Sequence, residues 1–294
     1  AGQLPVFAGT SCMSEHDDFP LSPGSWADSA AFYAAFLKAE EFLAALPAKA
    51  RGDNPDRLLH KVACDLYASR DQPGSLMRAA AGADEAGAAV WVSKVRTLAQ
   101  WLCASTQVPA FAGLSKEDLQ TISKTSVDVA KLHVLDDVLL ERGIILVHER
   151  AIPGAKVDGV VFKLKGGNPV IGMSLRYARL DHYWFTLMHE LSHVVLHSAL
   201  LNSPIVDDLD ADSQELVEKQ ANKLAADSMI PSHLWRTCPA RASLKEADIK
   251  RFAAEIGIAP HIAAGRLRRE MGRHDVFTPL VNSVNVREML FGQD

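Results

Sequence analysis

Residues 181–197 read DHYWFTLMHELSHVVLH, a stretch whose apolar residues recur every three or four positions and therefore predict a helix. Within it, residues 189–193 form an H-E-x-x-H pattern. Histidines at positions i and i+4 of a helix project from one face, so both imidazoles can bind one Zn²⁺ ion, and the glutamate can act on a water bound to it. The sequence predicts His189 and His193 as zinc ligands and Glu190 as the catalytic residue.

On a helical wheel, the three motif residues lie away from the apolar stripe of this helix. A histidine pair with a purely structural role would be expected at the rim of that stripe, beside a polar partner. The arrangement therefore favours a metal site. The stripe consists of Trp184, Leu187, Met188, Leu191, Val194 and Val195.

A catalytic zinc site needs a third protein ligand and one open coordination position. The third histidine of metzincins is excluded, because the residues after His193 read VVLHSA and lack both the required glycine and a histidine six residues on. His197 lies about 12 Å from His189 along the helix axis, so one ion cannot bind all three imidazoles. His197 is therefore interpreted as a polar residue at the helix end or in a substrate cleft.

An acidic residue on the next predicted helix, residues 213–229, is the better candidate for the third ligand. The apolar face of that helix lies closer to Glu218 than to Glu215 or Asp227. We therefore expect Glu218 to complete a gluzincin-like ligand set. Asn222 lies one turn later on the same side and is expected to orient a ligand through a hydrogen bond.

These roles predict amide hydrolysis. Zinc lowers the pKa of its bound water, Glu190 takes the proton, and protonated Glu190 can then donate to the leaving amine. Three residues near the motif are candidates for assisting at the oxyanion, and the sequence does not choose among them: His182, Tyr183 and His197.

Upstream of the motif, the chain changes from a helical to a β-rich pattern. Residues 26–125 are alanine-rich and helical, with a core-facing repeat made of Phe32, Ala35, Phe36, Ala39, Phe42 and Leu43. Short β-branched runs follow at residues 143–148, 159–164 and 170–175. The KGGN segment at residues 165–168 predicts a hairpin between the last two, and Pro169 suits a strand start or an edge.

The expected fold class is α+β. A helical N-terminal region, residues 26–125, precedes a zincin-like metallopeptidase domain, residues 126–294, with a small antiparallel sheet and the HExxH helix. Helices are predicted to return at residues 182–198, 213–229, 244–255 and 260–271. Residues 1–25 are expected to be a leader or loop, with Met13 as the candidate native start.

The composition suits a protein with a sizeable core. The chain has 294 residues, 48% of them hydrophobic, and a formal net charge of −5. No stretch approaches the roughly 18 apolar residues that a membrane span needs, and the mild acidity does not favour direct binding to nucleic acid. The four scattered cysteines and the lack of a secretory signal predict reduced thiols and a cytoplasmic location.

Residues 181–197, followed by EKQANKLAADSMIP at residues 218–231, resemble the ImmA/IrrE family of metallopeptidases. The resemblance implies that His189, His193 and Glu218 bind zinc and that Glu190 is the general base. It runs from about residue 89 to 270, because GVVF at 159–162 and IAPHIAAGRL at 258–267 resemble the subgroup fused to HigA-like regulators. No helix-turn-helix is evident in residues 13–88, so DNA binding by this chain is not favoured.

The resemblance also implies a cytoplasmic regulatory peptidase with a narrow protein substrate, such as a helix-turn-helix repressor cleaved in a stress or mobile-element response. Two alternatives remain open. One is a HigA-like transcriptional regulator or antitoxin, whose peptidase domain serves sensing or partner binding. The other is a zinc-stabilised interaction domain without turnover, in which His197 or another side chain closes the fourth coordination position.

Overall fold

The computed structural model describes residues 26–68, 70, 85–209 and 215–292 of the chain. Side chains are described from residue 29 onward. The expected leader at residues 1–25, with Met13 as a start, therefore lies outside the described residues. The four-stranded sheet is the centre of the molecule, and its strands are β1 (Ile145–His148), β2 (Gly159–Lys163), β3 (Pro169–Met173) and β4 (Ile205–Asp207).

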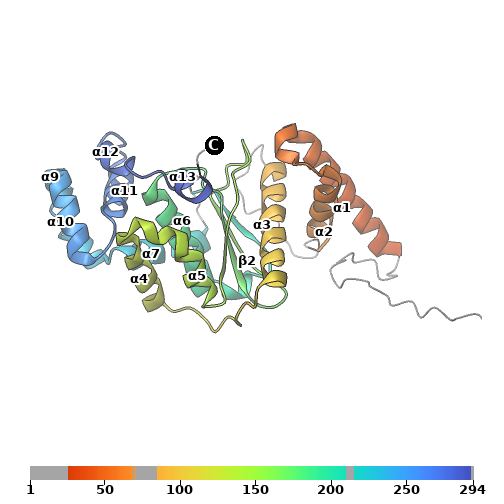
Figure 1. Cartoon of the computed structure of the whole chain (residues 1–294), viewed down its shortest axis with the longest axis horizontal. Helices are drawn as coiled ribbons and strands as arrows, with labels where there is room; N and C mark the ends of the chain where they lie inside the picture. Colours follow the sequence, from red (N-terminus) through yellow and green to blue (C-terminus); the bar gives the residue numbers. More distant parts are fainter. Residues whose placement is uncertain (1–25, 69, 71–84, 210–214, 293–294) are drawn as a thin grey trace, which may run out of the picture.

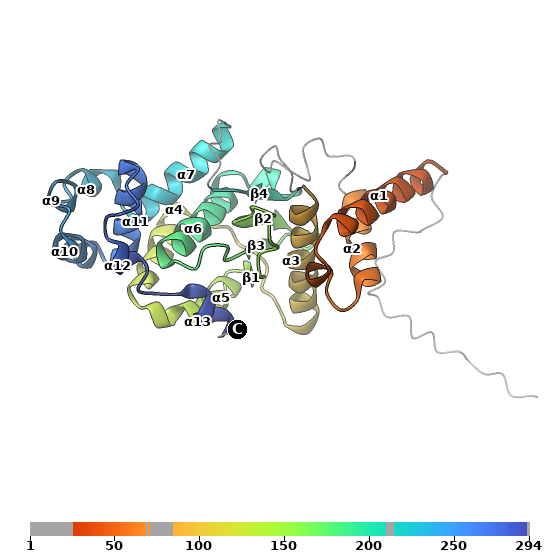
Figure 2. The ribbon, with the colours of Figure 1, turned by 90° about the horizontal axis from the view of Figure 1, so that it is seen from above.

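Helices cover both faces of the sheet (Figure 1). Helix α3 (Glu85–Ser105) packs on one face, and helix α6 (Leu180–Leu196), which carries the H-E-x-x-H residues, packs on the other. Figures 1 and 2 show α1 (Trp26–Ala45) and α2 (Pro55–Ala68) outside α3, on the side away from the sheet. The α+β class and the helical N-terminal region are confirmed.

The prediction that the sheet is antiparallel is wrong for one strand pair. The strand order is β1-β3-β2-β4, and the pairs β2–β3 and β2–β4 are antiparallel, whereas β1 runs parallel to β3. Since β4 already occupies the outer side of β2, β1 pairs with the free side of β3 in the hairpin. The hairpin itself forms where expected, with Gly167 at a φ of +89° in its turn and Pro169 as the first residue of β3.

Alternation along the strands divides the core into two layers. Val160, Val170 and Val206 face α3, while Val161 and Ile171 belong to the core beneath α6. The core on the α3 side includes Ala39, Phe42 and Leu43 of α1, with the rest of the predicted α1 stripe packed against it at partial exposure. The N-terminal helices therefore share one core with the sheet, and the boundary at residues 125 and 126 stays a prediction.

The remaining helices lie on the α6 side of the sheet (Figure 2): α4, α7 and α11 contact α6, α10 packs on α11, and α5 packs on β1. Helix α7 lies along α6, and α11 crosses it, beginning with Pro260 and ending before Gly272, which has a φ of +62°. These helices are α4 (Lys116–Lys124), α5 (Leu135–Leu140), α7 (Leu216–Met229), α8 (Ser232–Arg236), α9 (Ala240–Ser243), α10 (Glu246–Ile256), α11 (Pro260–Met271), α12 (Thr278–Val281) and α13 (Val286–Phe291).

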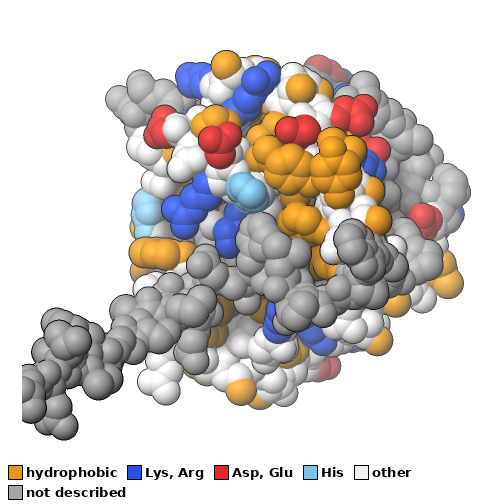
Figure 3. Space-filling model, turned by 90° about the vertical axis from the view of Figure 1, so that its right-hand side faces the viewer, with side chains coloured by type: hydrophobic (Ala, Val, Ile, Leu, Met, Phe, Trp, Pro, Cys, Tyr) orange, Lys and Arg blue, Asp and Glu red, His pale blue; other side chains and the backbone are white. Residues whose placement is uncertain are grey.

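Hydrophobic side chains gather on the outer face of the N-terminal helices (Figure 3). Tyr33 and Leu37 of α1 are 62% and 45% exposed. Within the described residues, no helix combines the length and the apolar character needed to cross a bilayer.

Cys64, Cys103 and Cys238 form no disulfide with one another, in agreement with the expected thiols, and Cys12 lies outside the described residues.

The close approach of α3 to β3 yields a stability prediction. A Cβ atom at Gly172 would lie 2.8 Å from Val160 Cγ1 and 2.8 Å from Val95 Cγ1. We expect Gly172→Ala to lower the free energy of unfolding by about 1–3 kcal/mol, because the helix and sheet must separate to admit the methyl group. Urea denaturation measures the change. Gly166→Ala is the matched control, since its Cβ would meet only Asn168 Oδ1, at 3.6 Å; equal stability of the two variants would contradict the prediction.

Candidate metal centre

Four side chains from three elements meet beneath the sheet. His189 and His193 come from α6, Glu218 from α7 and Asp207 from the end of β4, and one ligand atom of each lies within 4.8 Å of the others. Both histidine side chains are fully buried, and those of Asp207 and Glu218 are 7% and 12% exposed. Buried carboxylates require a compensating positive charge, so this cluster can hold a cation.

The distances between these atoms fit the ligand shell of one metal ion. Four ligands at about 2.0–2.1 Å from a tetrahedral zinc are roughly 3.3 Å from one another. His189 Nε2 is 3.0 Å from His193 Nε2, 3.2 Å from Glu218 Oε2 and 3.2 Å from Asp207 Oδ2. His193 Nε2 is 3.6 Å from Glu218 Oε2 and 3.8 Å from Asp207 Oδ2. Two imidazole nitrogens and two carboxylate oxygens therefore suit a divalent cation such as zinc.

Hydrogen bonds on the outer side of each histidine leave its Nε2 atom directed at the cluster. Asn222 Oδ1 lies 3.1 Å from His189 Nδ1 and can only accept, so Nδ1 carries the proton. Gln220 Oε1 likewise accepts from His197 Nε2 at 3.1 Å, which leaves His197 Nδ1 to accept from His193 Nδ1 at 3.0 Å. His197 thus supports His193 from behind and does not enter the cluster.

The electrostatics of the cluster favour a positive charge among the carboxylates. Burial by itself lowers the pKa of His189, but the carboxylates of Asp207 and Glu218 outweigh it and raise the pKa to about 9. Burial would raise the pKa of Glu218, yet hydrogen bonds from His189 and His193 hold it well below its usual range. A proton on His189 here neutralises charge as a metal ion would.

Glu190 lies beside the cluster in a space created by a glycine. Its carboxylate is fully buried, and within the described residues neither oxygen has a hydrogen-bond partner. A Cβ atom at Gly159 of β2 would come within 2.0 Å of Glu190 Oε1, so a side chain there would displace the carboxylate. Burial, followed by the nearby charges of Asp207 and Glu218, raises the pKa of Glu190 well above its ordinary value. A carboxylate with a raised pKa takes up a proton more readily than an exposed one, as a group that accepts and then donates a proton must.

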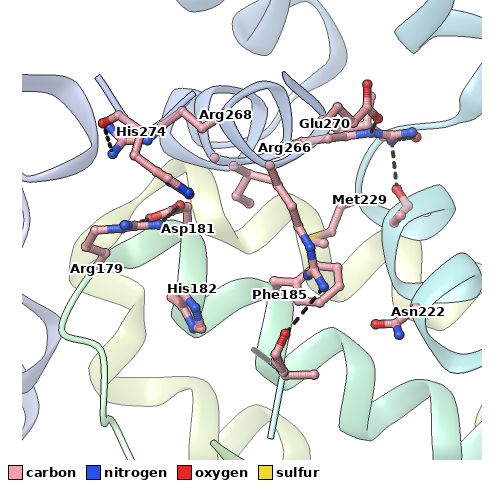
Figure 4. A pocket seen from close by; sticks show the side chains of 16 residues that line it. Arg179, Asp181, His182, Phe185, Asn222, Met229, Arg266, Arg268, Glu270 and His274 are labelled. Atoms are coloured by element: carbon pink, nitrogen blue, oxygen red, sulfur yellow. Dashed lines mark hydrogen bonds and ion pairs between the residues drawn. The ribbon is translucent and has the colours of Figure 1, made fainter. Parts of the chain in front are cut away.

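A cavity of 420 Å³ lies between α6, α7 and α11, and none of the four cluster residues lines it (Figure 4). Asn222 and Phe185 line it, and both also contact His189, by a hydrogen bond and by ring packing at 6.4 Å between centroids. Figure 4 shows Arg179 paired with Asp181 across the cavity from Asn222. More arginine than acidic side chains line this cavity: Arg179, Arg266, Arg268 and Arg269 against Asp181 and Glu270.

Of the three carboxylates considered for the third ligand, only Glu218 reaches the cluster. Glu215 precedes α7 and is exposed, and Asp227 forms a hydrogen bond with Ser232 on the surface. Among the residues considered for the oxyanion, Tyr183 is buried in the core with its hydroxyl 3.1 Å from His148 Nε2, whereas His182 lines the cavity.

Asp207 was missed by the sequence analysis because no strand was predicted for residues 205–207. In β4, Val206 faces α3, so its neighbours Ile205 and Asp207 face α6. The alternation in Ile-Val-Asp is too short to predict a strand by itself. The signal in the sequence is weak: an acidic residue that directly follows two β-branched residues, Ile205 and Val206.

The comparisons with known proteins identify the domain that contains this site. Residues 140–268 match the family model described as Peptidase M78, IrrE N-terminal-like domain. No curated protein and no solved structure matches the chain. The matched range includes the whole sheet, α6, α7 and all four cluster residues. The HigA-like subgroup stays a prediction. Residues 140–268 thus carry a domain of the M78 peptidase family, which supports the resemblance to the ImmA/IrrE family and indicates metallopeptidase activity.

Proposed function

We propose that the chain is a zinc-dependent endopeptidase, with His189, His193 and Glu218 as metal ligands and Glu190 as general base. The observation that carries this proposal is the convergence of the ligand atoms at the spacing of one ion's coordination shell, with the carboxylate of Glu190 beside them. Both histidine Nε2 atoms are directed into the cluster by their Nδ1 hydrogen bonds.

Each residue has a distinct role in the proposed reaction. When bound, zinc polarises the substrate carbonyl and lowers the pKa of an attacking water. Glu190 accepts a proton from that water and delivers it to the leaving amine, and its raised pKa suits both transfers. Asn222 holds the imidazole of His189 in one tautomer, and His197 does the same for His193. Gly159 keeps space for the carboxylate of Glu190.

The substrate is proposed to enter along the cavity between α6, α7 and α11. Two residues that line this cavity, Phe185 and Asn222, also contact His189. Strand β4 is the outermost strand on this side of the sheet, and an extended peptide can pair with such a strand through main-chain hydrogen bonds. His182 lines the same cavity and is our candidate for contacting the substrate oxygen.

The finer parts of the proposal rest on the family resemblance. We propose a cytoplasmic enzyme that cleaves a helix-turn-helix repressor in a stress or mobile-element response. Co-expression with repressors encoded at the same locus would test this through a fragment formed only with the active chain. The alternative of a HigA-like regulator predicts a mobility shift of the neighbouring promoter by the chain itself.

Removing a ligand should abolish metal binding. We expect the purified chain to hold one zinc ion and His189→Ala to hold none, measured by elemental analysis and calorimetry. Zinc should also stabilise the wild-type chain, by about 2.7 kcal/mol at a hundredfold excess over its Kd, because only the folded state assembles the site. His233→Ala, at an exposed histidine on α8, is the matched control and should bind like the wild type. Stoichiometric zinc in His189→Ala would contradict the assignment.

Removing the proposed base should separate binding from turnover. We expect Glu190→Gln to keep zinc and lose cleavage by a factor of about 10²–10⁴, since general base catalysis contributes an effect of that size. The measurement is the rate of fragment formation from a co-purified substrate. Glu215→Gln, at an exposed carboxylate near the centre, is the control for the charge change. Unchanged cleavage by Glu190→Gln would sink the proposed mechanism.

Loss of the orienting amide should weaken metal binding without abolishing it. Asn222→Ala removes the acceptor for His189 Nδ1 and is expected to lower zinc affinity by about 10–100-fold. Competition with a chromophoric chelator measures this. Asn222→Asp keeps an acceptor and should retain most of the affinity; if alanine and aspartate bind zinc as tightly as asparagine, Asn222 has no orienting role.

A further inference from the structure

Asp207 reaches the centre from the sheet, whereas the other three cluster residues come from α6 and α7. Its Oδ2 atom is buried and, within the described residues, has no well-aligned hydrogen bond, although it lies at ion-pair distance from His189. A buried carboxylate oxygen without a full hydrogen bond is costly unless a cation lies nearby. The oxygen lies 3.2 Å from His189 Nε2, the same distance as the predicted ligand oxygen of Glu218.

The position of Asp207 would suit a fourth ligand of a metal ion held by the other three residues. Distances of 3.2 Å and 3.8 Å from its Oδ2 to the two histidine nitrogens lie close to the roughly 3.3 Å spacing expected between ligands of one zinc ion. The corresponding distances for Glu218 are 3.2 Å and 3.6 Å. The two carboxylates are thus nearly equivalent with respect to the histidines.

Backbone contacts on both sides of Asp207 fix it in this place. Its carbonyl oxygen accepts from Asp158 N at 2.8 Å, and Leu209 N donates to Asp158 Oδ2 at 2.9 Å. The main chain of Asp207 is therefore held beside the start of β2, and rotation of its side chain would move the carboxylate away.

The charge of the cluster also favours four protein ligands. A divalent ion with two neutral imidazoles and the carboxylates of Asp207 and Glu218 gives a centre of zero net charge. Burying this neutral centre costs less free energy than burying a positively charged centre without Asp207 as a ligand, next to a separate Asp207 carboxylate. Because all four side chains are buried or nearly so, this balance matters here.

We propose that Asp207 is a fourth protein ligand of the metal, so that the resting centre is closed and opens to water only when this side chain rotates away. The inference rests on the proposed function for the identity of the site. It goes beyond that function because it adds a metal ligand from β4. It also implies that the peptidase is inactive until Asp207 leaves the metal. Asp207 would then hold the metal tightly at the expense of turnover.

The test compares Asp207→Asn with Asp208→Asn in the full chain. The two variants remove the same charge at adjacent positions, but the carboxylate of Asp208 binds Arg176 outside the cluster. We expect Asp207→Asn to lose at least about tenfold in zinc affinity, measured by chelator competition. The zinc-loaded variant should also bind acetohydroxamate, a ligand for open zinc positions, more tightly than the wild type. Asp208→Asn should match the wild type in both measurements.

A second measurement uses the wild-type chain alone and does not depend on folding of a variant. Loaded with Co²⁺, which adopts the four-coordinate geometry of zinc, it should show a visible spectrum that acetohydroxamate leaves unchanged, because no coordination position is left for another ligand. A spectrum that acetohydroxamate changes as readily in the wild type as in Asp207→Asn, or equal zinc affinities of the two, would overturn this inference and leave the proposed function standing. A wild-type chain that binds no divalent metal would contradict the proposed function, and this inference with it.

Discussion

The structure depends on burying several acidic groups beside two histidines on one helix. Glu190, Asp207 and Glu218 surround the imidazoles of His189 and His193, almost entirely out of contact with water. Such a group of charges is stable in a protein interior only when a cation or protons neutralise it. The packing of α6 against the sheet and against α7 places the carboxylates at a spacing that one divalent ion could satisfy.

The sheet makes this burial possible by approaching α6 closely. Gly159 leaves space for Glu190, and β4 directs Asp207 to the same side by alternation with Val206. The opposite face of the sheet packs on α3, where Gly172 admits the side chain of Val95. The N-terminal helices thus form part of the support beneath the metal centre, although the match to the family model begins only at residue 140.

A fourth ligand from the sheet would reconcile two interpretations of the sequence. The peptidase hypothesis requires an open coordination position, whereas a zinc-stabilised interaction domain requires a closed one. With Asp207 at the fourth position, one chain can occupy a closed state that holds its metal and an open state that hydrolyses a substrate. The side chain of Asp207 can move while its backbone stays bound to Asp158.

Local sequence patterns predicted the longer helices, the hairpin and three of the four residues of the cluster, but not the short helices α8, α9, α12 and α13. The 3.6-residue period and the H-E-x-x-H spacing are local, so they identify α6 and the shared face of His189 and His193 without any knowledge of neighbours. The apolar face of α7 then distinguished Glu218 from Glu215 and Asp227, and one helical turn pointed to Asn222. The parallel pairing of β1, the support of His193 by His197 and the place of Asp207 became evident only from the folded chain. Each of these depends on contacts between segments far apart in the chain, and a three-residue strand such as β4 is too short to show a pattern before the sheet forms.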